Sequence, residues 1–461
     1  MNKIFNKLRF KWYFHKALYA KALACLDRYP CKGDELWACY SLGMYDTAAK
    51  GSWDGCCLKG GFAFCVSLAA VGRFEEAENT AVLLERLRGF DKCRDKFSLA
   101  IALYMPSLAL RITKSPRLLA AISAQTDRQK AARLLEGLQI EGEFHLLKSN
   151  ILASTPKEQL CALNSFLTSY GLSEVSLADD KKCVSVTNIK CAALPNANTE
   201  NMPLVSILVT TYNTSPYVKS SLESLLSQSY KNLQIIVIDD NSTDDTVKRI
   251  KETAAKDNRV KFFINSANIG TFASKNIALK YAEGEFIVCH DSDDFAHPEW
   301  IQRQVEPLLE NKKLAACVSQ WIRVDNEGRY RARSIIPSSR LNATSLLFRK
   351  SVLEKTGSWD IVRTGADSEF YARLKLVFGK EAVKYVKLPL IIGAYRENSL
   401  TTSPLDGYDE NGISLVRLAY WEAWNKWHID CLKKSKKPIM PSLKRPFPVP
   451  QEIAVENIVT I

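Results

Sequence analysis

The sequence has no apolar run long enough to cross a bilayer. Its longest apolar stretch lies around residues 62–71, whereas a membrane-spanning helix needs about 20 apolar residues. The basic N-terminus also lacks the apolar core and the small-residue cleavage site of a secretory signal peptide. We therefore expect a cytoplasmic protein without a transmembrane helix.

Cysteine and histidine patterns typical of zinc sites are missing as well. None of the 13 cysteines belongs to a CxxC pair, and the adjacent Cys56 and Cys57 are poorly placed to bridge each other. The chain contains only five histidines. These spacings argue against a zinc site and favour reduced, mostly buried thiols.

Acidic residues are fewer than basic ones: the chain has 50 Asp and Glu residues and 63 Lys and Arg residues, which gives a net charge of +13. That excess favours an anionic partner, such as a nucleic acid, a membrane surface or a phosphorylated small molecule. The hydrophobic fraction of 46% and the charged fraction of 25% are ordinary for folded protein, so wholesale disorder is excluded. A length of 461 residues predicts two or three domains.

Positive charge gathers at both ends of the chain, and residues 1–33 hold a single acid, Asp27. Helical spacing there places an apolar face beside a basic stripe. The face comprises Ile4, Leu8 and Trp12, the stripe comprises Lys3, Lys7 and Lys11, and a second basic group comprises Lys433, Lys434, Lys436, Lys437, Lys444 and Arg445. These ends predict association with an anionic membrane surface, with a merely solubilising surface as the alternative. No nucleic-acid-binding motif accompanies the charge, so nucleic acid is not an expected partner.

Residues 1–190 have a helical pattern, rich in Ala, Leu, Lys and Glu. Residues 42–48 (LGMYDTA) are echoed at residues 71–77 (VGRFEEA), an offset typical of stacked helical hairpins. We expect an all-α domain, either a tetratricopeptide-like array that could bind a protein partner or an irregular bundle. Residues 191–202 contain a Pro and several Asn residues and predict a linker.

Strands and helices alternate after the linker. Expected strands lie at 205–210, 233–238, 260–264 and 286–289, and expected helices at 215–229, 243–255 and 271–282. This alternation predicts a mostly parallel, Rossmann-like α/β sheet over residues 203–402, with a helical and basic extension at 403–461. In such sheets, ligands bind beyond the carboxyl ends of the strands.

Polar residues follow these strands, at Thr210–Asn213, Asp239–Ser242 and His290–Asp294. Asp291, Asp293 and Asp294 are hard to explain as helix caps, because like charges repel unless a cation neutralises them. Carboxylate oxygens suit Mg²⁺, which often binds through one or two carboxylates and substrate phosphates. We therefore predict a metal site, with a solvated acidic turn as the alternative.

The ordered motifs resemble the family 2 glycosyltransferases, which have the GT-A fold. The resemblance covers roughly residues 203–400 and rests on 203–213 (PLVSILVTTYN), 237–244 (VIDDNSTD), 268–270 (NIG) with 275–276 (KN), 291–294 (DSDD), 347–350 (LFRK), 357–360 (GSWD) and 366–369 (ADSE). It implies a nucleotide-sugar donor, commonly a UDP-sugar, and a divalent cation, Mg²⁺ or Mn²⁺.

The resemblance also implies roles for individual residues. Thr210, Tyr212 and Asp240 would hold the nucleotide base. The rest of the expected donor site comprises Asn213, Asp239, Asn268, Lys275, Asp291 and Ser292, and the expected metal ligands are Asp291, Asp293 and Asp294. Asp367 would be the general base, with Glu369 as its rival. The alternative for both carboxylates is a salt bridge with Arg363 or Arg373.

Three positions depart from the family pattern. Lys275 stands where the family often has Arg, and Ala366 where an acid commonly precedes the base. Residues 395–398 (YREN) lack the usual final His, for which Arg396 or Asn398 could substitute.

The expected function is inverting transfer of a sugar to a glycan or lipid-linked glycan, in synthesis of a bacterial capsule or lipopolysaccharide. The protein would be cytoplasmic or peripheral on the inner face of the plasma membrane. A non-catalytic nucleotide-binding scaffold is the alternative. Sugar-1-phosphate nucleotidyl transfer is disfavoured, because residues 211–215 (TYNTS) are not a Gly-rich, Arg-containing phosphate loop.

Overall fold

The computed structural model describes residues 2–26, 33–191, 202–332, 335–397, 399–441 and 445–455, so most of the predicted linker lies outside the described residues. Contacts group the chain into two compact units. Unit 1 comprises residues 1–138, 333–335 and 398–453, and unit 2 comprises residues 139–332, 336–397 and 454–461. This grouping differs from the linear segments expected from the sequence, whose boundaries stay a prediction.

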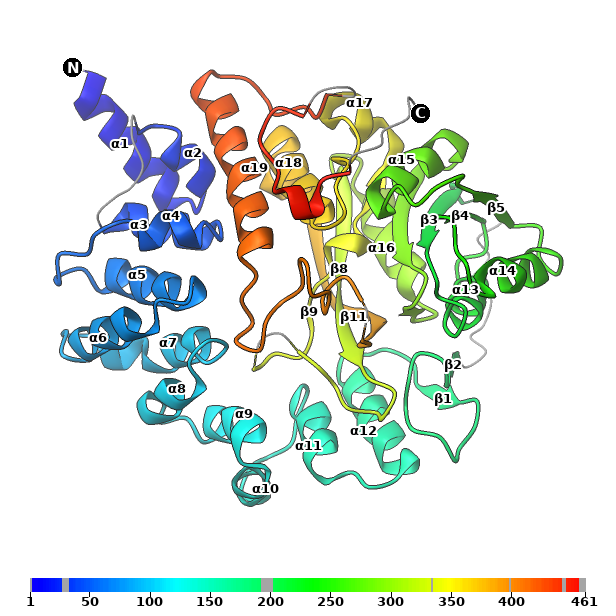
Figure 1. The fold of residues 1–461 in the computed structure, drawn as a ribbon, viewed down its shortest axis with the longest axis horizontal. Coiled ribbons are helices and arrows are strands. Elements are labelled where there is room, and N and C mark those ends of the chain that lie inside the picture. Colours follow the sequence, from blue (N-terminus) through cyan, green and yellow to red (C-terminus); the bar gives the residue numbers. More distant parts are fainter. Residues whose placement is uncertain are drawn as a thin grey trace. The chain divides into compact units, whose positions relative to one another are not determined.

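The regular secondary structure in the described residues of unit 1 consists of helices joined by loops. Figure 1 shows helices α1 to α10 following one another along this unit. They are α1 (Asn2–His15), α2 (Tyr19–Leu23), α3 (Asp34–Ser41), α4 (Tyr45–Ala49), α5 (Leu58–Ala70), α6 (Phe74–Glu85), η1 (Phe90–Lys92), α7 (Arg94–Ile101), α8 (Pro106–Ile112), α9 (Pro116–Thr126) and α10 (Arg128–Glu136). No helix of the described residues is both long enough and apolar enough to cross a membrane.

Local sequence explains where several of these helices begin. Helix α9 starts at Pro116, which tolerates the first turn because its missing N–H has no partner there, and the Ser115 hydroxyl accepts from the N–H of Leu118. Asp127 caps α10 in the same way, with its carboxylate 2.9 Å from the N–H of Lys130. Each cap accepts a hydrogen bond from a backbone N–H of the first turn that has no carbonyl partner within the helix.

Both copies of the echoed motif join two helices through a glycine. Gly43 follows α3 with φ 72°, and Gly72 follows α5 with φ 82°. In each copy the next residue donates its N–H to the carbonyl five positions back, a helix ending that needs a left-handed residue. These bonds run from Met44 to Cys39 and from Arg73 to Leu68, each 2.9 Å long. The echo therefore marks a repeated helix–turn–helix unit.

A helix from the C-terminal part of the chain completes unit 1. Helix α19 (Leu415–Lys433) packs against α2 and α4. Trp421 Nε1 donates to the carbonyl of Leu42 over 2.6 Å. The buried Glu422 carboxylate accepts from the N–H of Thr47 over 2.8 Å and from its hydroxyl over 2.5 Å. These bonds join segments that are nearly 380 residues apart in the sequence.

We expect Gly43→Ala to destabilise unit 1 by about 2–3 kcal/mol, because left-handed alanine is strained and the new methyl needs space. A Cβ at position 43 would lie 2.7 Å from Trp421 Nε1, whereas a Cβ at Gly72 meets no atom within 4 Å. Gly72→Ala is thus a matched control, with an expected loss of about 1 kcal/mol. Urea unfolding followed by tryptophan fluorescence measures both, and equal losses would contradict the contact with α19.

Unit 2 is built around a nine-stranded mixed sheet within the described residues. Its order is β5-β4-β3-β6-β10-β8-β11-β7, and β9 pairs with β8. The strands are β3 (Val205–Thr211), β4 (Leu233–Asp239), β5 (Val260–Ile264), β6 (Phe286–Asp291), β7 (Phe295–Ala296), β8 (Ala316–Val324), β9 (Arg340–Leu341), β10 (Leu347–Arg349) and β11 (Val383–Ala394). Strands β3 to β6 pair in parallel as expected, and β10 runs antiparallel to β6 and β8.

Helices connect these strands and cover the sheet (Figure 1). They are α13 (Val218–Leu226), α14 (Thr246–Ala254), α15 (Thr271–Tyr281), α16 (Trp300–Glu310), α17 (Leu353–Thr356) and α18 (Ala366–Phe378), with short turns η2 (Ala343–Ser345), η3 (Lys350–Val352) and η4 (Lys380–Ala382). Every residue of β3 and β4 is buried, as expected for parallel strands with helices on both faces. The predicted α/β architecture is confirmed.

The remaining elements are short or lie outside this sheet. Unit 2 also contains α11 (Phe144–Leu152), α12 (Pro156–Ser169) and a hairpin of β1 (Val175–Leu177) and β2 (Ile189–Cys191), and unit 1 contains η5 (Gln451–Ile453). The Asn150 side chain bonds both the N–H and the carbonyl of Tyr330 over 2.7 Å, which connects α11 to the loop after β8. Residues 139–191 thus pack as part of the α/β unit.

Candidate active site

The carboxyl ends of β3, β4 and β6 bring the predicted site residues to one edge of the sheet. In the parallel register, Thr210 pairs with Ile238 on one side and with Asp291 on the other. Thr211 pairs with Asp239. Side chains from distant sequence motifs therefore meet at this edge, as expected for ligand sites in parallel sheets.

The turn after β3 is held by the turn after β4. Asn213 adopts a positive φ of 49°, and its side-chain oxygen accepts from the N–H of Thr243 over 2.8 Å. The fully buried Asp239 accepts two bonds from Ser242, at 2.8 Å from the N–H and 2.6 Å from the hydroxyl. Asn213 and Asp239 thus shape the two turns, and beside them the Tyr212 side chain is 46% exposed.

Asp240 ties β4 to the loop that precedes α15. Its carboxylate accepts from the N–H of Ile269 at 2.9 Å, the N–H of Gly270 at 2.7 Å and Asn265 Nδ2 at 2.9 Å. Asp240 is also buried. The Ser274 hydroxyl donates a fourth bond over 3.3 Å. Since a carboxylate has about four lone-pair sites, a bond to a nucleotide base would have to compete with one of these four contacts.

The other expected donor residues near this edge have different surroundings. Thr210 and Thr271 share a hydrogen bond of 2.6 Å between their hydroxyls. The buried Ser292 hydroxyl lies 3.2 Å from that of Thr214. Asn268 is partly exposed, and its side-chain oxygen lies 3.4 Å from Arg363 Nη1.

The three acidic residues at the end of β6 and in the turn after it each contact a different partner. Asp291 lies 3.7 Å from Lys275 Nζ, Asp293 lies 2.7 Å from Arg396 Nε, and Asp294 accepts from the N–H of Ala394 over 3.1 Å. Burial raises the pKa of the Asp294 carboxyl well above its usual value, and repulsion from Asp293 and Asp291 raises it further. The three carboxyl groups are therefore close enough to repel one another, and a bound cation would relieve that repulsion.

Lys275 is the central cation of the site. Its side chain is only 3% exposed. Burial would lower the pKa of its ammonium group, but the carboxylates of Asp291 and Asp367 outweigh burial and leave the pKa raised. Lys275 therefore stays charged and offers a fixed positive group beside the two aspartates.

Asp367 lies in the first turn of α18 and lines the same small cavity as Lys275, Thr344 and Trp359. Its carboxylate accepts from the Thr344 hydroxyl over 3.2 Å and from the N–H of Ser368 over 2.7 Å. The side chain is partly exposed, and a carboxylate at a helix N-terminus is stabilised by the unpaired N–H groups there. Asp367 thus combines negative charge with access.

Glu369 has no such access. It is fully buried and forms a two-point ion pair with Arg373, at 2.9 Å from Nε and 2.8 Å from Nη2. Arg373 also donates to the carbonyls of Thr356 and Ser358. This geometry matches the salt-bridge alternative for Glu369 and favours Asp367 over Glu369 as the proposed base.

The histidines that flank the acidic cluster are both buried. His290 Nε2 lies 3.2 Å from the carbonyl of Asp294, and burial lowers the pKa of its imidazole to about 4. His297 Nε2 lies 3.0 Å from the carbonyl of Ser173. Both contacts are with backbone, so these rings help to hold the backbone around the acidic cluster.

Two arginines lie at the site although the sequence motifs did not assign them a definite role. Arg396 pairs with Asp293 and lies 5.5 Å above the Tyr217 ring, in the segment where a His is usual. Asn398 lies outside the described residues. Arg323 donates to the carbonyl of Ala394 over 2.9 Å, and its charge opposes the rise in the pKa of Asp294. Arg323 lies on β8, and Arg396 follows the end of β11. Both are far in sequence from the acidic cluster, so no local pattern could indicate these contacts.

A divalent cation fits the chemistry of the acidic cluster. Asp291 and Asp293 offer the hard oxygen donors that Mg²⁺ and Mn²⁺ prefer, and a cation would relieve the repulsion that raises the pKa of the neighbouring Asp294. Among the described residues, no group of three or more His, Cys, Asp or Glu side chains is arranged to hold a metal on its own. Further ligands would have to come from a bound donor.

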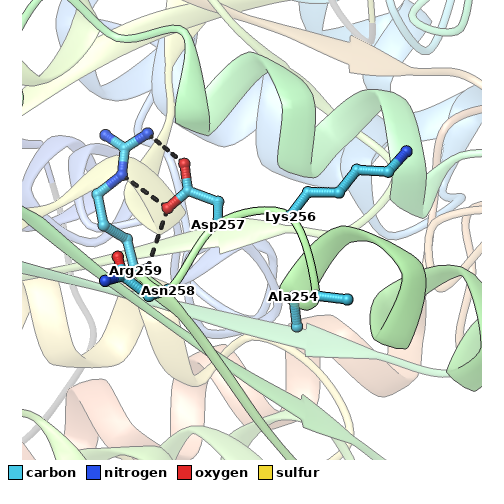
Figure 2. A pocket seen from close by; sticks show the side chains of 6 residues that line it. Ala254, Lys256, Asp257, Asn258 and Arg259 are labelled. Atoms are coloured by element: carbon cyan, nitrogen blue, oxygen red, sulfur yellow. Dashed lines mark hydrogen bonds and ion pairs between the residues drawn. The ribbon is translucent and has the colours of Figure 1, made fainter.

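A shallow hollow of unit 2 lies away from these residues. It is lined by residues 254–259, at the amino end of β5 and thus at the opposite edge of the sheet (Figure 2). Arg259 closes on Asp257 there through bonds of 3.0 Å and 2.8 Å. It contains none of the predicted site residues.

Part of the α/β unit is similar to known proteins. Residues 206–366 match the model of the family described as "Glycosyl transferase family 2". An "Uncharacterized glycosyltransferase" of Haemophilus influenzae is 41% identical over 120 residues, which cover 26% of this chain and 37% of that protein. The "Chondroitin synthase" of Escherichia coli is 33% identical over 135 residues, 29% of this chain and 20% of that protein.

A third relative has a more specific name. "UDP-Glc:alpha-D-GlcNAc-diphosphoundecaprenol beta-1,3-glucosyltransferase WfaP" of Escherichia coli is 38% identical over 120 residues, 26% of this chain and 47% of that protein. This chain thus spans less than half the length of each of these relatives.

Solved structures are similar over about half of the chain. Staphylococcus aureus TarS 1–349 in complex with UDP has a TM-score of 0.35 and 21% identity, over 42% of this chain and 60% of that chain. The mannosyltransferase PcManGT of Pyrobaculum calidifontis, in complex with GDP-Man and Mn²⁺, has a TM-score of 0.35 and 17% identity, over 50% of this chain and 72% of that chain.

The fold and the family match together define the class. Residues 206–366 carry a glycosyltransferase family 2 domain, and its strands belong to the α/β sheet of unit 2.

We expect Glu369→Gln to lower the free energy of unfolding by about 3–5 kcal/mol, because it leaves the buried Arg373 charge uncompensated. The control is Glu381→Gln, since the Glu381 side chain is 89% exposed and such substitutions usually change stability by less than about 0.5 kcal/mol. Thermal and urea unfolding measure both. If Glu369→Gln instead kept full stability and lost only turnover, Glu369 would return as a candidate base.

Proposed function

We propose that unit 2 transfers a sugar from a UDP-sugar to a hydroxyl of a glycan or lipid-linked glycan, with inversion at the anomeric carbon. The observation that carries this proposal is the convergence of Lys275, Asp291, Asp293 and Asp367 at the carboxyl edge of the sheet. The names of three relatives support it: one is a chondroitin synthase, and two others name a UDP-Glc donor and a diphosphoundecaprenol-linked acceptor.

The donor would bind with its base at the turn after β3. The exposed Tyr212 ring offers an aromatic face for stacking, and Thr210 lies at the same strand end. Asp240 would act mainly by fixing the 265–270 loop, whose backbone it holds. The ordered loop then forms one wall of the donor site.

The reaction requires that the negative charge on the diphosphate of the donor be neutralised as that group leaves. The buried Lys275 ammonium supplies a fixed positive charge, although as a point charge it lacks the two-pronged geometry of Arg. A divalent cation held by Asp291 and Asp293, with Asp294 beside them, would act as a Lewis acid that neutralises charge on the departing nucleoside diphosphate. Arg396, which pairs with Asp293, would have to adjust when that cation enters.

Asp367 would act as the general base. It would accept the proton of the acceptor hydroxyl as that oxygen forms a bond to the anomeric carbon and the bond from carbon to the diphosphate oxygen breaks. The Thr344 hydroxyl and the α18 N-terminus hold the carboxylate in one orientation. Lys275 near its other side keeps a positive charge close by.

A lipid-linked acceptor would require the protein to work at the inner face of a membrane. We therefore also propose a cytoplasmic protein that attaches peripherally and takes part in synthesis of a capsule or lipopolysaccharide. The helical unit would bind a protein partner or the membrane.

We expect Asp367→Asn to reduce turnover by at least about a hundredfold, because removing a general base typically costs that much. UDP binding should change little, since the substitution leaves Lys275, Asp291 and Tyr212 intact. Donor consumption and a thermal shift with UDP measure the two effects. Full activity of Asp367→Asn would refute the assignment, and loss of UDP binding would indicate a donor-binding role instead.

A donor panel tests the reaction class. UDP release from one nucleotide sugar in the presence of Mn²⁺ or Mg²⁺, and its loss with chelator, is the expected result. Asp293→Asn should weaken metal-dependent donor binding by tenfold or more, because a carboxylate ligand is removed, whereas the surface control Asp245→Asn should not. If nucleotides bind but no donor is consumed with any acceptor tried, the scaffold alternative would stand.

A further inference from the structure

Helix α1 has an outward face that the rest of unit 1 leaves uncovered. Leu8 is 61% exposed and Trp12 is 52% exposed, although both are large apolar side chains. They lie one helical turn apart and therefore form a continuous ridge. Phe10 and Phe14 on the opposite side are buried, and Phe14 packs against Tyr19 with ring centroids 5.7 Å apart.

Cations flank this ridge on both sides. Helical spacing puts Lys7 and Lys11 along one side and Lys16 along the other, and all three are exposed. Lys16 Nζ lies 4.1 Å above the Trp12 ring. Helix α1 contains no acidic residue. We define the α1 face as Lys7, Leu8, Lys11, Trp12 and Lys16.

A second basic group belongs to the same unit. Helix α1 packs on α2, which packs on α19, and Figure 1 shows the C-terminal end of α19 at the same end of unit 1 as α1. Four exposed lysines and an apolar side chain that is 53% exposed follow there. They are Lys433, Lys434, Lys436, Lys437 and Ile439.

We propose that the α1 face docks on an anionic lipid bilayer, with Leu8 and Trp12 entering the interface and the lysines pairing with lipid phosphates. An apolar ridge between cations is the arrangement of a helix that lies in the membrane plane. Each lysine near an anionic surface adds only a modest attraction, so several are needed and several are present. The basic group after α19 adds long-range attraction to the same surface.

Other occupants fit this face less well. A second copy of α1 would bring like charges together, which costs free energy. A nucleic acid could use the lysines and stack a base on Trp12, but it would leave Leu8 in water, since phosphate contacts need no aliphatic side chain. The docking surface names the membrane contact that the proposed function requires, but it rests on residues of unit 1 and needs no donor chemistry.

Vesicle co-sedimentation of the full chain, without nucleotide, tests the docking surface. We expect binding to mixed phosphatidylglycerol and phosphatidylcholine vesicles, weak binding to pure phosphatidylcholine, and loss of binding at high salt. Leu8→Ser/Trp12→Ser and Lys7→Gln/Lys11→Gln should each weaken binding by about tenfold or more. The matched controls Leu83→Ser, at a leucine that is 50% exposed on α6, and Lys312→Gln/Lys313→Gln should bind like the parent chain.

Three results would overturn the docking surface: a parent chain that stays in the supernatant, variants that bind like the parent, or equal binding to neutral vesicles. Binding of an RNA homopolymer that survives Leu8→Ser/Trp12→Ser, without vesicle binding, would assign the face to nucleic acid. If the apolar variant changed the circular dichroism spectrum, the charge variant would decide, because its lysines are exposed. A thermal shift with UDP stays separate: it should be the same in all variants.

Discussion

The burial of one positive charge among carboxylates is the constraint on which the candidate active site depends. Lys275 is almost inaccessible to water, so its charge is tolerable only because Asp291 and Asp367 surround it. Asp291 comes from the end of β6 and Asp367 from the start of α18. The ammonium group thus pairs with the end of β6 and lines one cavity with the first turn of α18, the two elements that would serve the donor and the acceptor.

The acidic residues of unit 2 divide into two groups by what surrounds them. Asp239, Asp240 and Glu369 are buried, and their oxygens are occupied by turn N–H groups or by Arg373. Asp291 and Asp367 keep partial exposure. A carboxylate that reacts with a ligand must be accessible to it, whereas a carboxylate that holds a loop accepts hydrogen bonds from buried groups. For these five residues, the degree of burial therefore distinguishes the proposed chemical roles from the structural ones better than the position in a motif does.

Much of the α/β unit follows from the sequence because its signals are local. The runs at β3, β4, β5 and β6 are β-branched and bounded by polar turns, and the expected strands agree with the observed ones within two residues. Polar residues at those strand ends must meet once the strands are parallel. The edge of the sheet was thus predictable from pattern alone.

Long-range packing was not predictable in the same way. The partner of Asp293 is Arg396, 103 residues away, and the partner of Thr47 is Glu422, 375 residues away. Strand β10 has only three residues, and its antiparallel direction depends on its neighbours. Glu369 and Arg373 have a helical i, i+4 spacing that suggests an ion pair, but the sequence cannot tell that the pair is buried.

The most direct test of the central claim is a crystal structure of the chain grown with UDP and Mn²⁺. We predict the uracil ring against Tyr212, the diphosphate between Lys275 and the Asp291–Asp293 turn, and Mn²⁺ bound by an aspartate of that turn and the phosphates. Density for UDP at another edge of the sheet, or none at saturating UDP, would contradict the claim that this edge is a nucleotide-sugar site.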